Sequence, residues 1–396
     1  MYNNEIIKEL DERRLKEKVN FGGKGKSIHQ SSKEFMKKID DLVKGELYEH
    51  KKENCSKECE KRGCQWVITL DGLWKLSYPI CMWVNSSATP QTLEEILPNV
   101  CTEEPEPRKA FCKAHCKNVE DFGRPSGLRE FINSCGANSE AYTKHGKKKV
   151  KSDLLLMSKK YPKSDSDKTF AESQGISDLL KNKELLKKEN CEVEEENEEC
   201  RKDLGEVSSL RRRSRGFEAF VTGGGIIKKL SPIYNSEGPL QVMLLIINFL
   251  QVFLKNVNVN EWGKLHLAFD NMCNIDRLKM LKNPLPLPGP DMPNVWKKIN
   301  KCIDQLHLKN HKNKLCQVKY NPSKVKEDFP EANLMVCEQT FAWLGRFKKI
   351  LNSTPKTHSH FLLHRLVLAR NRYTEYCYKE NRKPLLPSAK VVRSSK

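Results

Sequence analysis

The chain has 396 residues, enough for about two to three domains of ordinary size. Charged residues make up 31% and hydrophobic residues 38%, so part of the chain is expected to lie outside any packed core. The 71 Lys and Arg against 51 Asp and Glu give a net charge of +20, which favours a polyanionic partner, nucleic acid before an anionic membrane surface. The composition excludes collagen, a coiled-coil rod and an integral membrane protein.

Residues 1–50 are predicted to form a charged helical arm. Apolar residues such as Ile6, Leu10, Phe35 and Ile39 recur at helical spacing, but Lys and Glu surround them, so we expect a solvated arm. The first residues include no apolar segment typical of a secretory signal, and we therefore expect a nuclear or cytoplasmic protein that is not secreted. In such a reducing compartment, the 15 cysteines favour metal binding over disulfides.

Residues 51–138 are predicted to form a compact cysteine-rich module with short strands such as Trp66–Leu70. Zinc in proteins is usually bound by four thiolate or imidazole ligands, supplied as two closely spaced pairs. Because the spacing here is looser than that of a paired CxxC motif, reduced and buried structural thiols remain the alternative. The candidate ligands are the pairs Cys59/Cys64 and Cys112/His115, with Cys101 and Cys116 as alternates.

Residues 139–214 are predicted to be a disordered, low-complexity charged insert. They contain Lys147–Lys149, an acidic run from Glu192 to Glu199 and the basic cluster Arg211–Arg215. Blocks of like charge repel one another and cannot bury a core. The basic cluster fits a nuclear-localisation or DNA-contact patch and a solvated linker equally well.

Residues 215–385 again have the pattern of a folded region. Strands are expected at Phe217–Val221 and at Leu265–Phe269. The apolar segment Val242–Leu254 is interpreted as a buried core helix, because a membrane span needs about 20 apolar residues.

The end of the chain is predicted to be helical and basic. Residues 294–307 have a helical pattern, and Cys337–Leu351 and His360–Tyr378 are expected to be amphipathic helices, followed by a basic tail at 386–396. Basic side chains on the last two helices are candidate phosphate contacts, although solvation at the surface explains each one equally well. These residues are Arg346, Lys348, Lys349, Arg365, Arg370 and Arg372.

Three carboxylates stand at the ends of expected elements. Asp71 and Asp270 each end an apolar run, and Glu338 begins a helix. Two acids on strands and a third on a later helix is the layout with which ribonuclease-H-like nucleotidyl transferases hold two Mg²⁺ ions. The structural alternatives are a hairpin turn at Asp71-Gly72, a helix N-cap at Asp270 and a favourable first-turn charge at Glu338.

A further group of soft ligands follows at His307, His311 and Cys316. Two histidines four residues apart lie on one helical face and can share a metal ion or a phosphate. A pair of structural histidines in a basic helix is the more common explanation of this pattern.

Three blocks of the sequence resemble proteins of the Kyakuja-Dileera-Zisupton (KDZ) transposons that carry a cysteine cluster. Together they cover the larger part of the chain. The first comprises Gly63–Cys81, Leu97–Cys101, Phe111–Cys116 and Gly127–Phe131, the second Arg215–Gly216, Gly223–Ile226 and Tyr234–Pro239, and the third Phe269–Cys273, His307–His311, Cys337–Leu344 and Arg370–Tyr373.

This resemblance implies a transposase with a ribonuclease-H-like core and an associated zinc-binding cysteine cluster. Asp71, Asp270 and Glu338 match the positions of the three metal-binding acids of that family. We therefore expect an α+β protein in which a cysteine-rich zinc module and a helix-rich, ribonuclease-H-like C-terminal region are separated by the disordered charged insert.

The expected function is that of a transposon-derived DNA-binding protein. If its site is active, it cleaves and transfers DNA strands with Mg²⁺, and structural Zn²⁺ holds the cysteine module. The alternative is a non-catalytic, zinc-stabilised DNA- or protein-interaction module. DNA is the expected partner and self-association is compatible with this reading, whereas neither a membrane nor a small-molecule substrate is expected.

Overall fold

A five-stranded mixed sheet organises the computed structural model, which describes residues 2–13, 28–50, 55–73, 75–84, 100–137, 144–161, 213–235 and 237–385. The strand order is β3-β2-β1-β4-β5. β2 pairs antiparallel with both β1 and β3, whereas β4 runs parallel to β1 and β5 runs parallel to β4. The strands are β1 Val67–Leu73, β2 Gly216–Thr222, β3 Ile227–Ile233, β4 His266–Phe269 and β5 Asn300–Cys302.

β1 is the central strand, although it comes from the part of the chain predicted to be a separate cysteine module. Asp71 and Gly72 do not form a hairpin turn; they continue β1 and pair with Ala219 and Glu218 of β2. Residues 51–138 are therefore not an independent module, because β1 completes a sheet whose other strands come from residues 215–385.

The turn between β2 and β3 explains the Gly223–Gly225 motif. Gly225 has a φ of +88°, which side chains rarely adopt, and a Cβ on Gly223 would lie 2.4 Å from the carbonyl oxygen of Arg62. The turn therefore packs closely against the segment that follows α3 (Lys57–Glu60). This contact joins the N-terminal end of β1 to the turn that connects β2 and β3.

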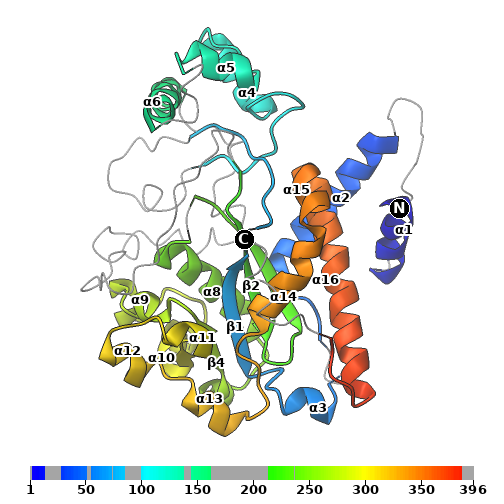
Figure 1. Ribbon diagram of the computed structural model, residues 1–396, viewed down its shortest axis with the longest axis vertical. Coiled ribbons are helices and arrows are strands. Elements are labelled where there is room, and N and C mark those ends of the chain that lie inside the picture. The colour runs from blue at the N-terminus through cyan, green and yellow to red at the C-terminus, as the bar shows by residue number, and fades with distance from the viewer. Residues whose placement is uncertain are drawn as a thin grey trace.

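Helices surround the sheet (Figure 1). α8 (Pro239–Phe253) is apolar on nearly all sides and almost wholly buried, as expected for the core helix, and α14 (Val336–Leu344) contacts β1 and β2. η9 (Gly345–Phe347) and α15 (Lys348–Ser353) then lead to α16 (Lys356–Lys379). No helix in the described ranges has both the length and the hydropathy that a membrane crossing requires.

The N-terminal helices pack against the body of the protein and are not a solvated arm. α1 (Tyr2–Glu12) and α2 (Ile28–Gly45) share a small apolar cluster with α16, in which Ile6, Phe35, Ile39 and Phe361 are buried. The helical periodicity is therefore a correct indication, but it marks a docked face, because these apolar residues form one buried cluster with Phe361 of α16.

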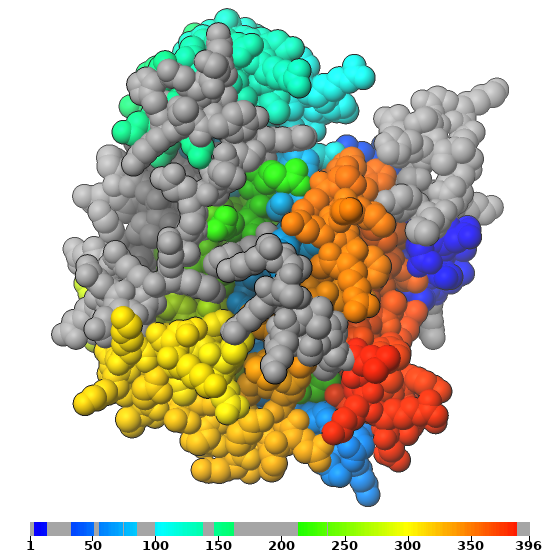
Figure 2. Space-filling model, in the orientation of Figure 1, coloured from blue at the N-terminus to red at the C-terminus, as the bar shows by residue number. Residues whose placement is uncertain are grey.

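A separate lobe is formed by α4 (Lys113–Asp121), α5 (Leu128–Ser134) and α6 (Lys144–Lys160). Figure 2 shows this lobe in cyan and teal at one end of the molecule. α6 lies in the predicted disordered insert, yet Val150, Leu154 and Met157 are buried in the lobe core. The insert expected at 139–214 is thus wrong for 144–161, whereas residues 162–212 and the basic tail at 386–396 lie outside the described residues.

The 3-10 helix η6 (Val259–Lys264) precedes β4, and a series of short elements connects β4 to α14. The helices of this series are α9 Met272–Asp276, η7 Lys279–Lys282, η8 Met292–Asn294, α10 Val295–Lys298, α11 Gln305–Leu308, α12 Lys314–Lys319 and α13 Ser323–Asp328. The single helix expected over 294–307 is wrong. Residues 300–302 form β5 instead, because they pair in parallel with residues 266–268 of β4.

Candidate metal centres and carboxylate site

Three carboxylates converge at one edge of the sheet. Leu70 pairs with Phe269 in parallel, so the residues that follow, Asp71 and Asp270, continue this register side by side. Glu237, from the segment between β3 and α8, is the third member. One carboxylate oxygen from each lies within 4.8 Å of the others, and all three side chains are buried.

This carboxylate site, defined as Asp71, Glu237 and Asp270, has the chemistry of a site for hard cations. Buried carboxylates repel one another, and a divalent cation offsets that repulsion. An all-oxygen donor set suits Mg²⁺ or Mn²⁺, whereas zinc in structural sites prefers sulfur and nitrogen. Asp270 is not a helix cap, because the N-cap of α9 is Asn271.

Glu338 lies beside the carboxylate site but is not among its converging oxygens. α14 is held on β1 by Cys337, whose Sγ is 3.2 Å from Thr69 Oγ1 and 3.4 Å from the Thr69 carbonyl oxygen. In the first turn of this helix, Glu338 Oε1 is 4.0 Å from Nε2 of His307. The acid predicted third therefore does not join Asp71 and Asp270; it faces the imidazole of His307.

His307 connects the two groups of acids. Its Nδ1 is 2.7 Å from Asp304 Oδ2. Burial lowers the pKa of His307, but the hydrogen bond to Asp304 and the charges of Asp304, Asp270 and Asp71 outweigh burial and raise it to about 9. An imidazolium ion thus faces the carboxylates at neutral pH.

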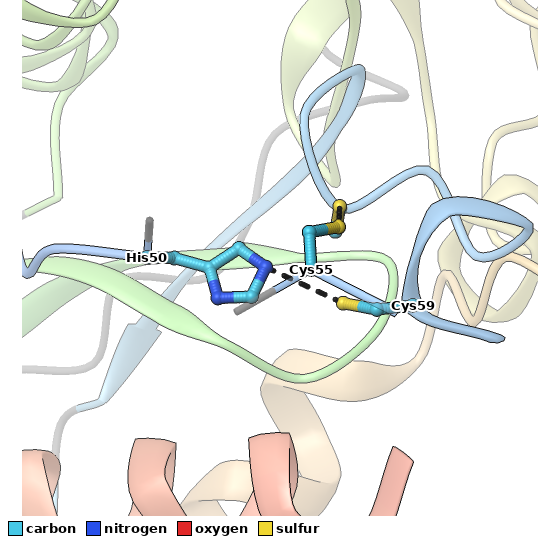
Figure 3. Close-up of side chains that lie close together, drawn as sticks. His50, Cys55 and Cys59 are labelled. Carbon is cyan, nitrogen blue, oxygen red and sulfur yellow. Dashed lines mark hydrogen bonds between the residues drawn. The ribbon is translucent and has the colours of Figure 1, made fainter. Parts of the chain in front are cut away.

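A first thiol-imidazole group, the His50 site, consists of His50, Cys55, Cys59 and Cys64. Figure 3 shows the first three of these side chains close together. The His50 Nε2 atom is 3.5 Å from Cys59 Sγ, and Cys55 Sγ is 2.9 Å from Cys64 Sγ. The ligand atoms all lie within 4.8 Å of one another, close enough for the four side chains to converge on one metal ion such as zinc.

Two features outside the ligands support metal binding at the His50 site. The second ring nitrogen, Nδ1, is 2.6 Å from the Glu375 carboxylate of α16, and a carboxylate behind a ligating histidine is the usual arrangement in zinc proteins. Gly63 has a φ of +67° and turns the chain so that Cys64 returns toward α3 before β1 begins.

A second group, the His115 site, lies at the base of the lobe and consists of Cys81, Cys101, Cys112 and His115, all buried. His115 Nδ1 is 3.1 Å from Cys112 Sγ and 3.5 Å from Cys81 Sγ. The backbone N–H of Cys112 donates to Cys81 Sγ at 3.3 Å, and Trp83 stacks on the imidazole with ring centroids 4.5 Å apart.

The thiols of the His115 site influence one another. Burial raises the pKa of Cys81, whereas hydrogen bonds with Cys101 and Cys81 lower the pKa of Cys112 well below its ordinary value. Thiols release their protons when a metal binds, so these side chains can supply thiolates and an imidazole to one cation. Both cysteine-rich groups can therefore hold a metal such as zinc.

The sequence-predicted zinc ligands divide between these two sites. Cys59 and Cys64 belong to the His50 site, so they do not share an ion with Cys112 and His115. Cys116 belongs to neither group, because its Sγ is turned toward the carbonyl oxygen of Phe111 at 3.4 Å. Three ligands were missed by the spacing argument: His50, Cys55 and Cys81.

The expected pair of His307 and His311 is also separated. His307 faces Asp304 and Glu338, whereas His311 and Cys316 meet Cys273 in a third group. The two histidines do not share a ligand in this structure.

The candidate phosphate contacts differ in exposure. Arg346, Lys348 and Lys349 are exposed on η9 and α15. Arg372 is exposed and pairs with Glu12 at 2.8 Å.

The other two arginines are buried. Arg365 forms ion pairs with Glu5, Glu9 and Glu12 of α1, and Arg370 lies over the rings of Trp343 and Tyr373. Arg365 and Arg370 therefore serve packing in this structure and do not present their guanidinium groups to a partner.

No protein-family profile, no curated protein and no solved structure matches the chain.

Proposed function

We propose that the protein cleaves and transfers DNA strands with the help of divalent cations bound at the carboxylate site. The observation that carries this proposal is the convergence of three carboxylates. The parallel register of β1 and β4 brings Asp71 next to Asp270, and Glu237 joins them. The sequence pattern itself predicts two of these acids, Asp71 and Asp270, as catalytic residues.

The strand order supports a ribonuclease-H-like core for this proposal. Three antiparallel strands, followed by two strands parallel to the first in the order β3-β2-β1-β4-β5, form the sheet arrangement expected of that fold. Acids on the first and fourth strands and on a later helix agree with the layout of nucleotidyl transferases. The resemblance of three sequence blocks to KDZ transposon proteins points in the same direction and implies DNA as the substrate and the nucleus as its location.

The chain's own groups have distinct parts in this chemistry. Asp71, Glu237 and Asp270 supply oxygen ligands in a buried cluster of negative charge. Bound divalent cations would activate a water or a 3′-hydroxyl and stabilise the leaving oxygen. Glu338 lies 4.0 Å from His307, whose imidazole is in the electrostatic field of Asp270 and Asp71.

The scissile strand is held by positive charge near Glu338. Arg346, Lys348 and Lys349 lie on the elements that follow α14 directly, so they carry exposed positive charge for a phosphate backbone close to the helix of Glu338. These contacts position the substrate but carry no base sequence information.

Nicking of supercoiled plasmid in Mg²⁺ or Mn²⁺ tests the proposal. Asp270→Asn should lower the nicking rate at least about 100-fold, since a bound cation loses one of its charged ligands. The same variant should be no less stable than the wild type without metal, because one member of a repelling group has been neutralised. Mg²⁺ should raise the melting temperature of the wild type more than that of the variant.

Asp328→Asn is the matched control. Asp328 contacts His266 at the start of β4, whereas Asp270 follows the end of the same strand. The control should nick plasmid at the wild-type rate. Absence of nicking by the wild type in either metal, or equal nicking by Asp270→Asn and the wild type, would exclude this site as catalytic.

A non-catalytic, zinc-stabilised interaction module is the second candidate function. It is favoured by the Cys/His groups, which can hold zinc without any contribution from the carboxylates. DNA binding by the wild type and by Asp270→Asn with equal affinity, and nicking by neither, would support this candidate.

A further inference from the structure

A third group of soft ligands adjoins the carboxylate site and has no part in the function proposed above. It comprises Cys273 in α9, His311 between α11 and α12, and Cys316 in α12. One ligand atom from each lies within 4.8 Å of the others, and Cys273 Sγ is 3.7 Å from His311 Nδ1. Both cysteines are fully buried, whereas the imidazole is half-buried and has one side toward the surface.

The imidazole of His311 is oriented as in a metal ligand. Its Nε2 is 2.9 Å from the carbonyl oxygen of Asp270, which can only accept a hydrogen bond, so Nε2 carries the proton. Nδ1 of the neutral ring therefore presents its lone pair on the side of Cys273 Sγ. A ligating histidine whose other N–H donates to a backbone carbonyl is a recurrent arrangement in metal proteins.

The loop that carries His311 is held in place by hydrogen bonds within the protein. The side-chain amide of Gln317 donates to the carbonyl oxygens of Leu308 and His311, both at 2.7 Å. Asn313 caps α12 by accepting from the backbone N–H of Leu315 at 2.8 Å. His311 and Cys316 thus belong to one braced loop–helix unit, and Cys273 approaches from α9.

We propose that Cys273, His311 and Cys316 bind one zinc ion. Two thiolates and one imidazole form a donor set that suits zinc and disfavours Mg²⁺ or Ca²⁺. Three protein ligands leave a fourth position for water or another small ligand. This centre, the His311 site, is separate in ligands and in donor chemistry from the carboxylate site.

The ion would connect two segments that both reach the carboxylate site. Cys273 follows Asp270 by three positions, and His311 donates to the Asp270 carbonyl oxygen. His307, which contacts Glu338, belongs to the same α11–α12 segment as His311. This positioning role rests on the proposed function, whereas the presence of the zinc ion does not.

Cadmium-113 NMR of the full-length wild type tests the site without a variant. The His50 and His115 sites each offer three thiolates and one imidazole, whereas the His311 site offers two thiolates. Because the cadmium shift depends on the number of bound thiolates, a distinct resonance of a two-thiolate site is expected. A spectrum with three-thiolate resonances alone would overturn the proposal.

Zinc content of variants gives an independent test. Cys316→Ala should contain one zinc equivalent less per chain than the wild type, and Cys273→Ser should show the same loss. The control is Cys302→Ala, which removes a buried thiol of β5 that belongs to none of these groups. Equal zinc in the wild type and in a folded Cys316→Ala or Cys273→Ser protein would contradict the assignment, with circular dichroism as the check of folding.

Failure of this proposal can be distinguished from failure of the proposed function. Asp270→Asn keeps the backbone carbonyl that accepts from His311, so it should retain the full zinc content while it loses nicking. If the two-thiolate cadmium resonance is absent, or if the wild type and the cysteine variants contain equal zinc, the assignment of the His311 site is wrong. The nicking result would be unaffected by either outcome.

Discussion

At the scale of single residues, Cys112 and Cys116 at the start of α4 show that two cysteines with equally suitable spacing can point to different partners. Cys112 precedes the helix and its Sγ is 3.1 Å from His115 Nδ1. Cys116 lies one turn later and contacts the carbonyl oxygen of Phe111 instead. Both fit a spacing argument, because spacing says nothing about the direction in which each thiol points.

These two residues therefore form a matched pair of variants. Cys112→Ser should remove one zinc equivalent per chain and destabilise the lobe of α4–α6, because the small lobe core relies on its metal. Cys116→Ser should keep the zinc and the lobe. Metal analysis and limited proteolysis of the two purified proteins measure the difference. Equal loss of zinc from both variants would contradict the assignment of Cys112 as the ligand.

At the residue scale, the sequence indicates a position best where one element fixes the side chain. Asp71 and Asp270 each end an apolar run, and parallel pairing brings the two run ends together. Glu237 lies in a connection before Gly238-Pro239, where no periodicity marks it. His50 stands alone before the cysteines, and only the fold shows that its ring meets Cys59 and Cys64.

At the scale of elements, the docking of α1 on α16 is electrostatic as well as apolar. Glu9 is 2% exposed, and its carboxylate is 2.6 Å from Arg365 and 3.0 Å from His364. Burial raises the pKa of Glu9, but hydrogen bonds with His364, Arg13 and Arg365 outweigh it and lower the pKa to about 2.

This shift predicts a stability that depends on pH. A carboxyl group with a lowered folded-state pKa stabilises the protein above its ordinary value of 4.5, and the contribution is lost as the pH falls toward about 2. Glu9→Gln should cost about 1–3 kcal/mol of unfolding free energy at neutral pH, because it removes the most buried of the three carboxylates that pair with Arg365. The difference from the wild type should shrink as the pH falls through that window.

Urea denaturation of both proteins across this pH range measures the effect. Glu261→Gln is the control, since Glu261 forms an exposed pair with Lys264, and exposed pairs contribute about 0–1 kcal/mol. A constant difference between Glu9→Gln and the wild type at all pH values would show that the charge of Glu9 does not hold α1.

The sequence predicted the type of the long elements better than that of the short ones. The apolar segment at 242–254 corresponds to α8, and the strands expected at 217–221 and 265–269 correspond to β2 and β4. β5 was missed because a three-residue strand has too little sequence to show a period, and its existence depends on pairing with β4. α6 was missed because its buried face is narrow and its composition is dominated by Lys.

At the scale of the whole molecule, the net charge of +20 is not used uniformly. Arg365 and Arg372 bind the acidic α1, whereas Arg346, Lys348 and Lys349 are exposed next to the helix of Glu338. Total charge is readable from composition, but its division between internal ion pairs and free surface is a property of the fold.

Salt dependence of DNA binding tests this division. Each phosphate contact removed lowers the slope of log K against log salt concentration by about 0.9, so Lys348→Ala/Lys349→Ala should lower it by about 2. The control, Lys57→Ala/Lys61→Ala, removes two exposed charges on α3 and its C-cap, ahead of the N-terminal end of β1, and should leave the slope unchanged. Equal slopes for the two double variants would place the DNA elsewhere.

The central position of β1 has a consequence for how the protein is made. Thr69 contacts the carbonyl oxygen of Val221, which is 152 positions further along the chain, and the other neighbour of β1 comes later still. During synthesis β1 therefore emerges long before either neighbour, with both of its hydrogen-bonding edges open and an apolar sequence between them. Folding must close this long loop before the sheet gains stability, so slow folding and association through unpaired β1 strands are the hazards built into this topology.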